Sequence, residues 1–472
     1  SINTNWQEGG NNTGINYPAD NVDPNSGYGT HITGSTTGEN GFDATGSGNS
    51  SLFALNNGAQ AWEAITNTDA TTLTAGTPLR LMVRGDRSID LTTNAATPSN
   101  TTLRSTGTLA TATIQTTGAE LNHNAGAFNF IGNPYQASVN VNDVLAGSNN
   151  IKASEVWVWD ATLGARGQYV TVLLDGTGSS NGATSKSYHY IQPGQSFFTA
   201  TENTVGDNST SVVFNETDKA VGNDVAVFNN NATTFASSSQ LIAKLYRTDR
   251  YGTDAGLQDN FVILYDNNYS NELTSEDVSK FYNIDENMGI LKEGTLLSVD
   301  KLAMPTENDE VQLYNALYRV SNYTLDITAS GFNEVTPYLE DTYTGELTML
   351  ENGLNTITFS VDQTIEASIE ATRFKIVYQS QALSTEGNDT IDFAMYPNPV
   401  TDGTLSLTAT KLAGLTVDVT ITNLLGQQVI AQPLLFDGAT ATITNLHNLK
   451  AGVYILSITS QDVAISHRIV IQ

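Results

Sequence analysis

Two acidic, asparagine-rich segments contain the residues whose types and spacing suit metal binding. One runs from Asp20 to Asn25, and the other includes Asp249, Asp254 and Asp259, followed by Asn260. Carboxylate and carbonyl oxygens so closely spaced can form the cage of about six to eight oxygen ligands that Ca²⁺ requires. Neither segment matches an EF-hand loop, and Asx-turns explain the same composition equally well. Calcium is therefore an open alternative, and the sequence predicts no other metal site and no cofactor.

No constellation of residues in the sequence indicates catalysis. The five histidines are scattered without the H-x-x-x-H or H-E-x-x-H spacing of zinc enzymes. The chain has no cysteine, which excludes thiolate nucleophiles and thiolate metal ligands. A G-x-S-x-G elbow and a Walker loop are also absent from the sequence. Because 49 residues are acidic, carboxylate pairs carry no information about glycoside hydrolysis, and we expect no catalytic residue and no enzyme.

Two short features suit binding rather than catalysis. The tripeptide at 84–86 is Arg-Gly-Asp, which occurs in integrin ligands, but here it stands between two apolar runs, where a strand-connecting turn explains it. Trp157 with Trp159, and Tyr188 with Tyr190, are two residues apart, so each pair shares one face of a predicted strand. Such pairs can stack on sugars, although core or cross-strand packing is the more common role.

The charge and composition of the chain exclude several classes of partner. A net charge of −29 argues against binding to nucleic acid, which requires a basic surface, and against an anionic membrane surface. No apolar segment is long enough to span a bilayer as a helix, so we expect no direct membrane insertion. The chain begins at Ser1 without an initiator methionine or a leader, and we expect a mature or truncated piece of a larger protein.

The elements that position these residues are predicted to be short strands. Asn, Thr, Ser and Gly recur throughout the sequence, and they disfavour long helices. Short runs of β-branched and aromatic residues alternate with turn residues. We therefore predict an all-β protein with several β-sandwich-like domains in series, ending in an immunoglobulin-like sandwich. One short helix is expected at 274–281, where Ser-Glu-Asp resembles a helix start.

Shifts in charge divide the chain into domains. Residues 1–222 carry 18 acids and 8 bases, and residues 223–380 carry 24 and 9, whereas residues 393–472 carry only 4 and 3. A polar stretch rich in Ser, Thr, Gly and Asn at 381–392 reads as a linker. We predict a β-rich region at 1–222 with a further division near 118–127, a jelly-roll-like β-sandwich at 223–380, and a separate C-terminal domain.

The C-terminal domain contains four short motifs in a fixed order. They are Met-Tyr-Pro-Asn-Pro-Val at 395–400, Asn-Leu-Leu-Gly-Gln-Gln-Val at 423–429, Ala-Gly-Val-Tyr-Ile-Leu at 451–456, and His-Arg-Ile-Val at 467–470. The prolines suit the edge of a sandwich, because they fix φ and donate no ladder hydrogen bond. Gly426 suits a tight hairpin turn, and Gly452 a close turn before the apolar strand that follows it.

This order closely resembles the type A C-terminal sorting domain of proteins exported through the type IX secretion system. The resemblance implies a secreted or cell-surface protein whose last domain is recognised by the outer-membrane translocon and its shuttle protein. The chain ends without the basic residue that is common at this terminus, and Arg468 is the candidate for that role. The positions that match the family's motifs, and so are expected to carry recognition, are Tyr396, Pro397, Asn398, Pro399, Gly426, Gln427, Gly452, Val453, Tyr454 and Arg468.

The upstream region resembles an uncharacterised region that precedes such sorting domains in large surface proteins, including adhesins of gliding bacteria. The segments that carry this resemblance are 5–10, 29–34, 83–88, 130–135 and 191–198. We therefore expect the C-terminal stalk and secretion signal of an adhesin-like protein connected with gliding motility. Two alternatives stay open: the non-catalytic C-terminus of a secreted hydrolase, or a carbohydrate-binding module whose partners are surface glycans.

Overall fold

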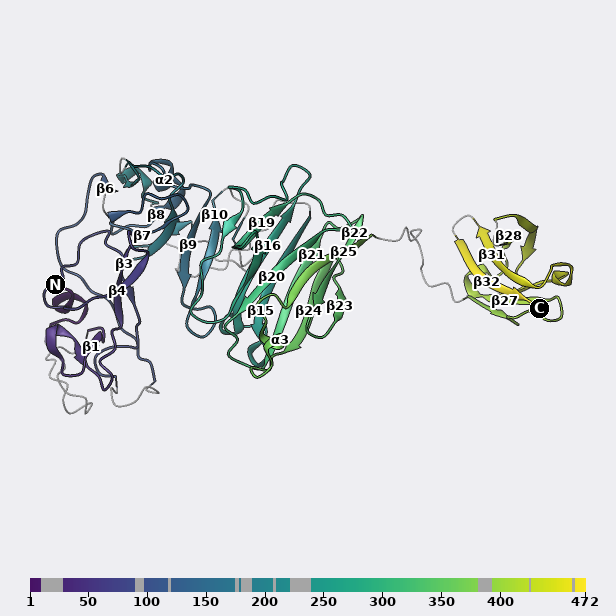
Figure 1. Cartoon of the computed structure of the whole chain (residues 1–472), viewed down its shortest axis with the longest axis horizontal. Coiled ribbons are helices and arrows are strands. Elements are labelled where there is room, and N and C mark those ends of the chain that lie inside the picture. Colours follow the sequence, from purple (N-terminus) through teal and green to yellow (C-terminus); the bar gives the residue numbers. More distant parts are fainter. Residues whose placement is uncertain are drawn as a thin grey trace. The chain divides into compact units, whose positions relative to one another are not determined.

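The protein is described here by a computed structural model, in which strands joined by turns make up most of the chain (Figure 1). The structure describes residues 1–9, 29–89, 97–117, 120–174, 178–179, 189–206, 209–220, 239–380, 393–423, 426–460 and 463–472. The α-helices among these residues are α1 (Ile2–Trp6), α2 (Val141–Ala146) and α3 (Glu366–Ile369). None of the described helices is long and apolar enough to cross a membrane. The all-β prediction is confirmed.

Contacts divide the chain into two compact units, residues 1–381 and residues 382–472. The first unit begins with small sheets around a core formed by Ile2, Ile32, Phe42 and Leu52. Its strands are β1 (Thr33–Ser35) with β2 (Asp43–Ala44), and β3 (Leu52–Asn56) between β4 (Ala61–Ala64) and β5 (Arg80–Leu81).

A five-stranded sheet follows, and its two faces pack against different cores. On β9, Val156 and Val158 face a core that they share with α2, whereas Trp157 faces the next sheet along the chain. The indole nitrogen of Trp157 donates a hydrogen bond to the carbonyl oxygen of Ser279 at 3.2 Å. Side chains on either side of the predicted boundary at 222 thus share one apolar cluster. The strands, in sheet order, are β11 (Gly178–Ser179), β10 (Gln168–Leu173), β9 (Glu155–Asp160), β13 (Ser196–Ala200) and β7 (Phe128–Gly132). Two separate two-stranded sheets are formed by β12 (Tyr190–Ile191) and β8 (Val139–Asn140), and by β14 (Ser211–Phe214) and β6 (Ile114–Thr117).

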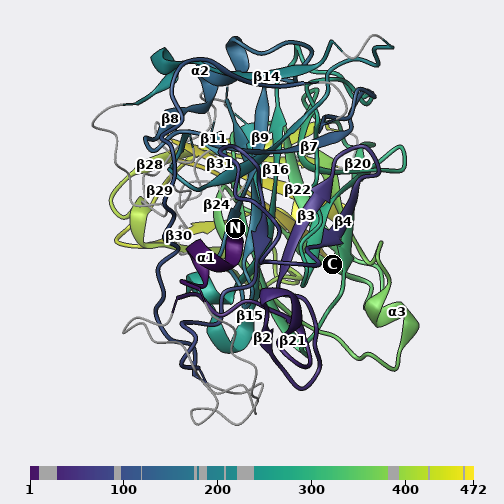
Figure 2. The ribbon, with the colours of Figure 1, turned by 90° about the vertical axis from the view of Figure 1, so that its left-hand side faces the viewer.

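The largest sheet has eleven strands and folds over a single core to which most of them contribute. Its burial alternates along strands such as β22, as the period of two in a half-buried strand requires. The helix α3, which follows β24 in the chain, projects outward at the lower right of Figure 2. The strands in sheet order are β23 (Glu346–Met349), β22 (Val335–Asp341), β25 (Phe374–Ser380), β20 (Glu310–Ala316), β18 (Asn287–Lys292), β19 (Thr295–Leu302), β16 (Leu257–Tyr265), β15 (Ser239–Arg247), β21 (Asn322–Ser330) and β24 (Gly353–Ser360), with β17 (Val278–Ser279) on β19.

The helix expected at 274–281 is wrong. Val278 pairs with Val299 as part of strand β17, and its side chain is buried in the apolar cluster between the two sheets. Phe281 packs against the same cluster and contacts the ring of Phe198 at a centroid distance of 4.4 Å. Burial of both side chains in the sheet interface overrides the weak local preference for a helix start.

The second unit consists of two sheets packed around one core. Val417, Val419 and Ile421 alternate inward along β28, and Leu456 and Ile458 do the same on β31. This agrees with the alternation that predicts a sandwich from the sequence. One sheet contains β26 (Phe393–Tyr396), β27 (Leu405–Ala409) and β30 (Thr440–Ile443), and the other β29 (Gln428–Leu435), β28 (Thr416–Asn423), β31 (Gly452–Ser460) and β32 (Val463–Ile471).

Candidate sorting site in the C-terminal unit

The first and last motifs of the C-terminal unit are held together by one asparagine. The side-chain amide of Asn398 donates a hydrogen bond to the carbonyl oxygen of Arg468 at 3.0 Å. Its side-chain oxygen accepts one from the backbone N–H of Val470 at 2.9 Å. Two residues later, Val400 forms a parallel bridge with Ile471. The segment Tyr-Pro-Asn-Pro is therefore fixed along the last strand of the domain.

The prolines keep this segment out of regular pairing. Strand β26 ends at Tyr396, immediately before Pro397, and ladder pairing resumes only at Val400. Both X–Pro peptide bonds, Tyr396–Pro397 and Asn398–Pro399, are cis. In the segment between Tyr396 and Val400, the proline nitrogens cannot donate hydrogen bonds, and the side chain of Asn398 forms the hydrogen bonds to the last strand instead.

Two predicted recognition residues present their side chains to solvent near this segment. Tyr396 is 78% exposed, although it is aromatic and belongs to a strand. The side chain of Arg468 on β32 is exposed as well. Beside them, the rings of Phe393 and His467 stack with a centroid distance of 4.9 Å and an interplanar angle of 16°. An exposed aromatic ring and a guanidinium are side chains that protein interfaces favour, so this edge is suited to contact a partner.

Gly426 and Gln427 form the hairpin turn between β28 and β29, as the sequence predicts. Gly426 has a φ of +78°, a conformation that glycine adopts without steric cost. The backbone N–H of Gln427 donates to the side-chain oxygen of Asn423 at 3.0 Å, and the N–H of Asn423 donates to the carbonyl oxygen of Gln427 at 3.0 Å. The residues at 424–425 lie outside the described part of the chain.

Gly452, expected in a close turn before the apolar strand, is instead part of that strand. Gly452 is the first residue of β31, its φ does not lie in the left-handed region, and an added Cβ would meet no atom closer than 3.8 Å. Val453 is half-buried and pairs with Val470, and the hydroxyl of the buried Tyr454 donates to the carbonyl oxygen of Lys450 at 2.9 Å. These residues build the last hairpin, and a Cβ at position 452 has the space that it needs.

We predict that replacing Asn398 with alanine loosens the last strand. The substitution removes both hydrogen bonds of the side chain and is expected to cost about 1 kcal/mol. Hydrogen exchange at the backbone amide of Val470 should become faster, because that N–H loses its acceptor. Thr408→Ala, on an exposed position of β27, is the matched control and should leave this amide unchanged. Unaltered exchange at Val470 in the Asn398 variant would contradict the anchoring role.

The acidic residues proposed for calcium are not brought together. Asp249 is paired with Arg247, with 3.0 Å between Oδ2 and Nη2, whereas Asp259 is buried beside Lys280, with 2.7 Å between Oδ2 and Nζ. Among the residues that the structure describes, no group of three acidic or histidine side chains is placed to hold a metal ion. The other candidate, Asp20 to Asn25, lies outside the described residues. The calcium interpretation of the second segment thus loses its ligand set.

The other binding features from the sequence are used in packing. Gly85 of the Arg-Gly-Asp tripeptide is buried, and the N–H of Asp86 donates to the hydroxyl of Ser99 at 3.0 Å. Trp157 is buried in a sheet interface, and Trp159 contacts the ring of Tyr169 at a centroid distance of 4.7 Å, so this pair forms no open platform. Position 188 lies outside the described residues.

Val400 and His467 lie within the motifs, but the sequence indicates no role for either, and it does not identify Phe393. The stack of Phe393 on His467 and the pairing of Val400 with Ile471 join opposite ends of the domain. No local pattern of residues encodes either contact. The only available signal was that the first and last motifs flank strands of the same predicted sandwich.

Comparison with known proteins gives one informative match. The model of the family described as "Secretion system C-terminal sorting domain" matches residues 394–472. No curated protein matches the chain. Among solved structures, dimeric latent PorU from Porphyromonas gingivalis is 12% identical with a TM-score of 0.15, and the match covers 59% of this chain and 35% of that one. The BSP domain of a biofilm associated protein is 8% identical with a TM-score of 0.14, covering 78% of this chain and 98% of that one.

The two structural likenesses are too weak to bear on fold or function. The family match coincides with the second compact unit and with all four motifs, and it agrees with the resemblance drawn from the residues themselves. It implies that the unit interacts with the secretion machinery and that the protein is secreted or displayed at the cell surface. The C-terminal unit is a secretion system sorting domain, and the chain that carries it is cargo of the type IX secretion system.

Proposed function

We propose that this chain is the C-terminal stalk and secretion signal of an adhesin-like surface protein. In this proposal, the second unit directs export and the first unit remains outside the cell as part of the surface structure. The observation that carries the export half is the sorting domain at residues 394–472, whose terminal motifs are joined through Asn398. The adhesin-like half is supported by a strand-rich first unit and by the resemblance of its sequence to the region before such domains in surface proteins.

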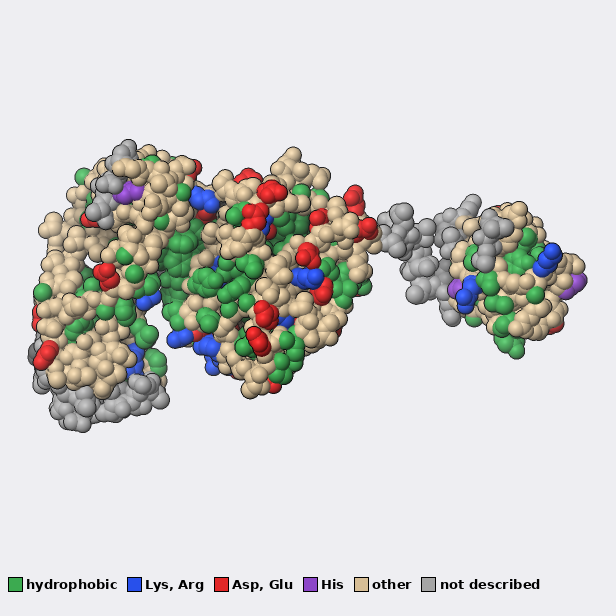
Figure 3. All heavy atoms as spheres, viewed as in Figure 1, with side chains coloured by type: hydrophobic (Ala, Val, Ile, Leu, Met, Phe, Trp, Pro, Cys, Tyr) green, Lys and Arg blue, Asp and Glu red, His purple; other side chains and the backbone are tan. Residues whose placement is uncertain are grey.

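The difference in charge between the two units supports different roles for them. Acidic side chains are spread over the visible face of the first unit, whereas few are seen on the visible face of the second (Figure 3). Residues 393–472 carry only 4 acids and 3 bases. A nearly neutral domain approaches a protein receptor without the repulsion that a strongly acidic surface would impose. We propose that the translocon and its outer-membrane shuttle protein contact the edge that carries Tyr396 and Arg468.

An export experiment tests the proposal. A signal peptide and an inert fluorescent protein, fused in front of residues 382–472, should be secreted by a cell that has the type IX system. The same fusion without residues 393–472 should stay in the periplasm. If the complete fusion also stays in the periplasm while its C-terminal unit is folded and protease-resistant, the unit is insufficient for export.

Within that fusion, Tyr396→Ala is expected to reduce export about tenfold without lowering the melting temperature. An interface aromatic commonly contributes more than about 1 kcal/mol to binding, and about 1.4 kcal/mol corresponds to a factor of ten. Tyr396 is 78% exposed, so its removal costs little packing. Leu415→Ala, at another exposed apolar position of the unit, is the matched control and should be exported normally. Equal export of the two variants would remove Tyr396 from the recognition surface.

One alternative is that the chain is the non-catalytic C-terminus of a secreted hydrolase. Both proposals assign the same role to the second unit and differ in what the full-length protein contains besides this chain. The full-length sequence separates them: further strand-rich repeats support the adhesin-like protein, whereas a recognisable catalytic domain supports the hydrolase.

A further inference from the structure

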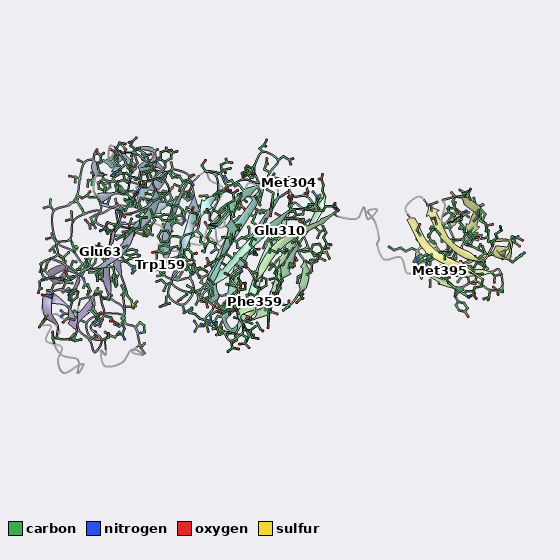
Figure 4. All side chains as sticks on the ribbon, in the orientation of Figure 1. Glu63, Trp159, Met304, Glu310, Phe359 and Met395 are labelled. Carbon is green, nitrogen blue, oxygen red and sulfur yellow. The ribbon has the colours of Figure 1, made fainter. Side chains whose placement is uncertain are left out.

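A groove of about 840 Å³ opens at one end of the large sheet in the first unit. We call it the end groove. It lies where β15 and β24 end, where β21 begins and where β22 turns into β23. Phe359, on its wall, is seen in Figure 4 toward the end of β24. Its volume falls within the range of about 300–1,000 Å³ that is usual for ligand sites.

The end groove has an aromatic wall that is held rigidly. The ring of Phe359 stacks on Tyr323, with centroids 5.6 Å apart and an interplanar angle of 21°. The ring of Tyr343, which is 38% exposed, lies 4.9 Å from the guanidinium carbon of Arg373. Asp341 fixes that guanidinium through hydrogen bonds of 2.8 Å from Nε and 2.6 Å from Nη2. Tyr343 is thus supported by a fixed cation while part of its surface stays open, which suits stacking on a flat apolar face.

Polar groups that are already paired with one another surround this wall. Arg247 donates two hydrogen bonds to Asp249, at 3.1 and 3.0 Å, and Asp249 is 58% exposed. The hydroxyl of Ser360 donates to the side-chain oxygen of Asn322 at 3.0 Å. Both pairs keep further donor or acceptor capacity, because a carboxylate accepts several hydrogen bonds and an amide has two N–H groups. Adjacent donors and acceptors at fixed positions match the neighbouring hydroxyls of a sugar ring.

The charges of the end groove disfavour anionic ligands. Arg247 and Arg373 are each neutralised by an aspartate partner. The carboxylate of Glu346, which also lines the groove, has no cationic partner among the described residues. The groove therefore carries a net negative charge and repels phosphate, sulfate and nucleic acid.

We propose that the end groove binds a neutral, hydroxyl-rich glycan. The inference deepens the proposed adhesin-like function, on which it rests, by naming a ligand class and a site for it. The ring of Tyr343 stacks on the apolar face of a hexose, and the Arg247–Asp249 and Asn322–Ser360 pairs bind its hydroxyls. These side chains come from β15, β21, β24 and the turn after β22, so the site is formed only by the folded sheet.

An extended peptide is the competing occupant. No strand among the described residues pairs with the outer edges of β23 and β24, the two ends of the sheet order, so a peptide could extend the sheet there. Strand β23, however, has only four residues, and the groove lies at the ends of the strands rather than along an edge. The groove also presents hydroxyl, amide and carboxylate groups instead of a row of apolar pockets for alternate side chains. These observations favour a glycan.

The test uses the purified full chain in affinity electrophoresis through gels that contain a neutral glucan, mannan or galactan, with a sulfated polysaccharide as the anionic arm. We expect retardation by at least one neutral polysaccharide and none by the sulfated one. Tyr343→Ala should weaken that retardation at least about tenfold. Tyr282→Ala, at a 53% exposed tyrosine outside the groove, is the matched control and should bind as the parent does.

A second variant, Asn322→Ala, keeps the test valid if loss of Tyr343 disturbs Arg373, because it removes only an exposed polar contact. The proposal is overturned if no neutral polysaccharide retards the chain, if only the sulfated one does, or if both groove variants bind as the parent does. If the chain binds an extended peptide and the same two variants lose that binding, the groove is a peptide site instead. If beads coated with the parent chain adhere to cells and beads coated with the Tyr343→Ala variant adhere equally well, the adhesin-like function stands and only the proposed glycan site is refuted.

Discussion

Replacing Arg87 with leucine is expected to destabilise the first unit by about 3–5 kcal/mol, because the change leaves a buried carboxylate without its cation. The side chains of Arg87 and Asp43 are both completely buried, with 2.8 Å between Nη2 and Oδ1. Nη1 of Arg87 also donates to the carbonyl oxygen of Gln7 at 3.0 Å. The single guanidinium thus joins the N-terminal segment to β2, and its loss affects three parts of the chain.

Urea unfolding of the full chain checks this expectation. The double variant Arg87→Leu/Asp43→Asn should recover part of the lost stability, because asparagine carries no charge and can still accept the hydrogen bond from the N–H of Ile32. Lys375→Met, which breaks partly exposed pairs with Glu310 and Glu340, is the control and should cost less than about 1 kcal/mol. A loss in the Arg87 variant as small as that of the control would show that the buried pair contributes little.

The sequence predicted the features that depend on local patterns. Alternation along Val417–Ile421 and Val453–Ile458 predicted strands β28 and β31, because a half-buried strand imposes a period of two on its residues. Gly426 predicted the turn between β28 and β29, because the turn requires a positive φ. In each case the physical cause acts within a few residues, so it leaves a signal that can be read directly.

Features that depend on distant contacts could not be predicted in this way. Asn398 is anchored on Val470, and Arg87 on Asp43, across separations that no local pattern records. The end groove takes its walls from several strands, and the proposed role of Tyr343 depends on Arg373, which Asp341 fixes beside its ring. The helix expected at 274–281 failed for the same reason, since burial of Val278 between two sheets is a tertiary effect.

The second large effect is expected on the pH dependence of stability. The side chain of Asp300 lies in a buried group with Lys292, whose Nζ is 2.8 Å from Oδ1 of Asp300 and 3.3 Å from Oδ2 of Asp277. Burial raises the pKa of Asp300 to about 6, and the neighbouring Asp277 adds to this, although Lys292 acts in the opposite direction. In the unfolded chain the pKa of an aspartate is about 3.9.

The sign of the effect follows from these two pKa values. Between about pH 4 and pH 6 the folded protein keeps a proton on Asp300 that the unfolded chain has released, so this residue makes stability fall as the pH rises through that window. The full contribution is about 3 kcal/mol, since a tenfold change in a protonation equilibrium corresponds to about 1.4 kcal/mol. Above about pH 6 both states have lost the proton, and the contribution no longer changes.

Asp300→Asn should remove this component, because the amide does not titrate. The free energy of unfolding, measured with urea at intervals from pH 4 to pH 7, should therefore shift in favour of the variant by about 3 kcal/mol between pH 4 and pH 6 and stay level above. Asp362→Asn is the control: hydrogen bonds from Thr364 lower the pKa of Asp362, so its contribution is lost only as the pH falls below about 4, and the difference from the parent should stay nearly level from pH 4 to pH 7. The prediction fails if the difference in unfolding free energy between the parent and the Asp300 variant stays constant from pH 4 to pH 6. Asp300 would then ionise in the folded protein as it does in the unfolded chain, because Lys292 would fully offset the cost of burial.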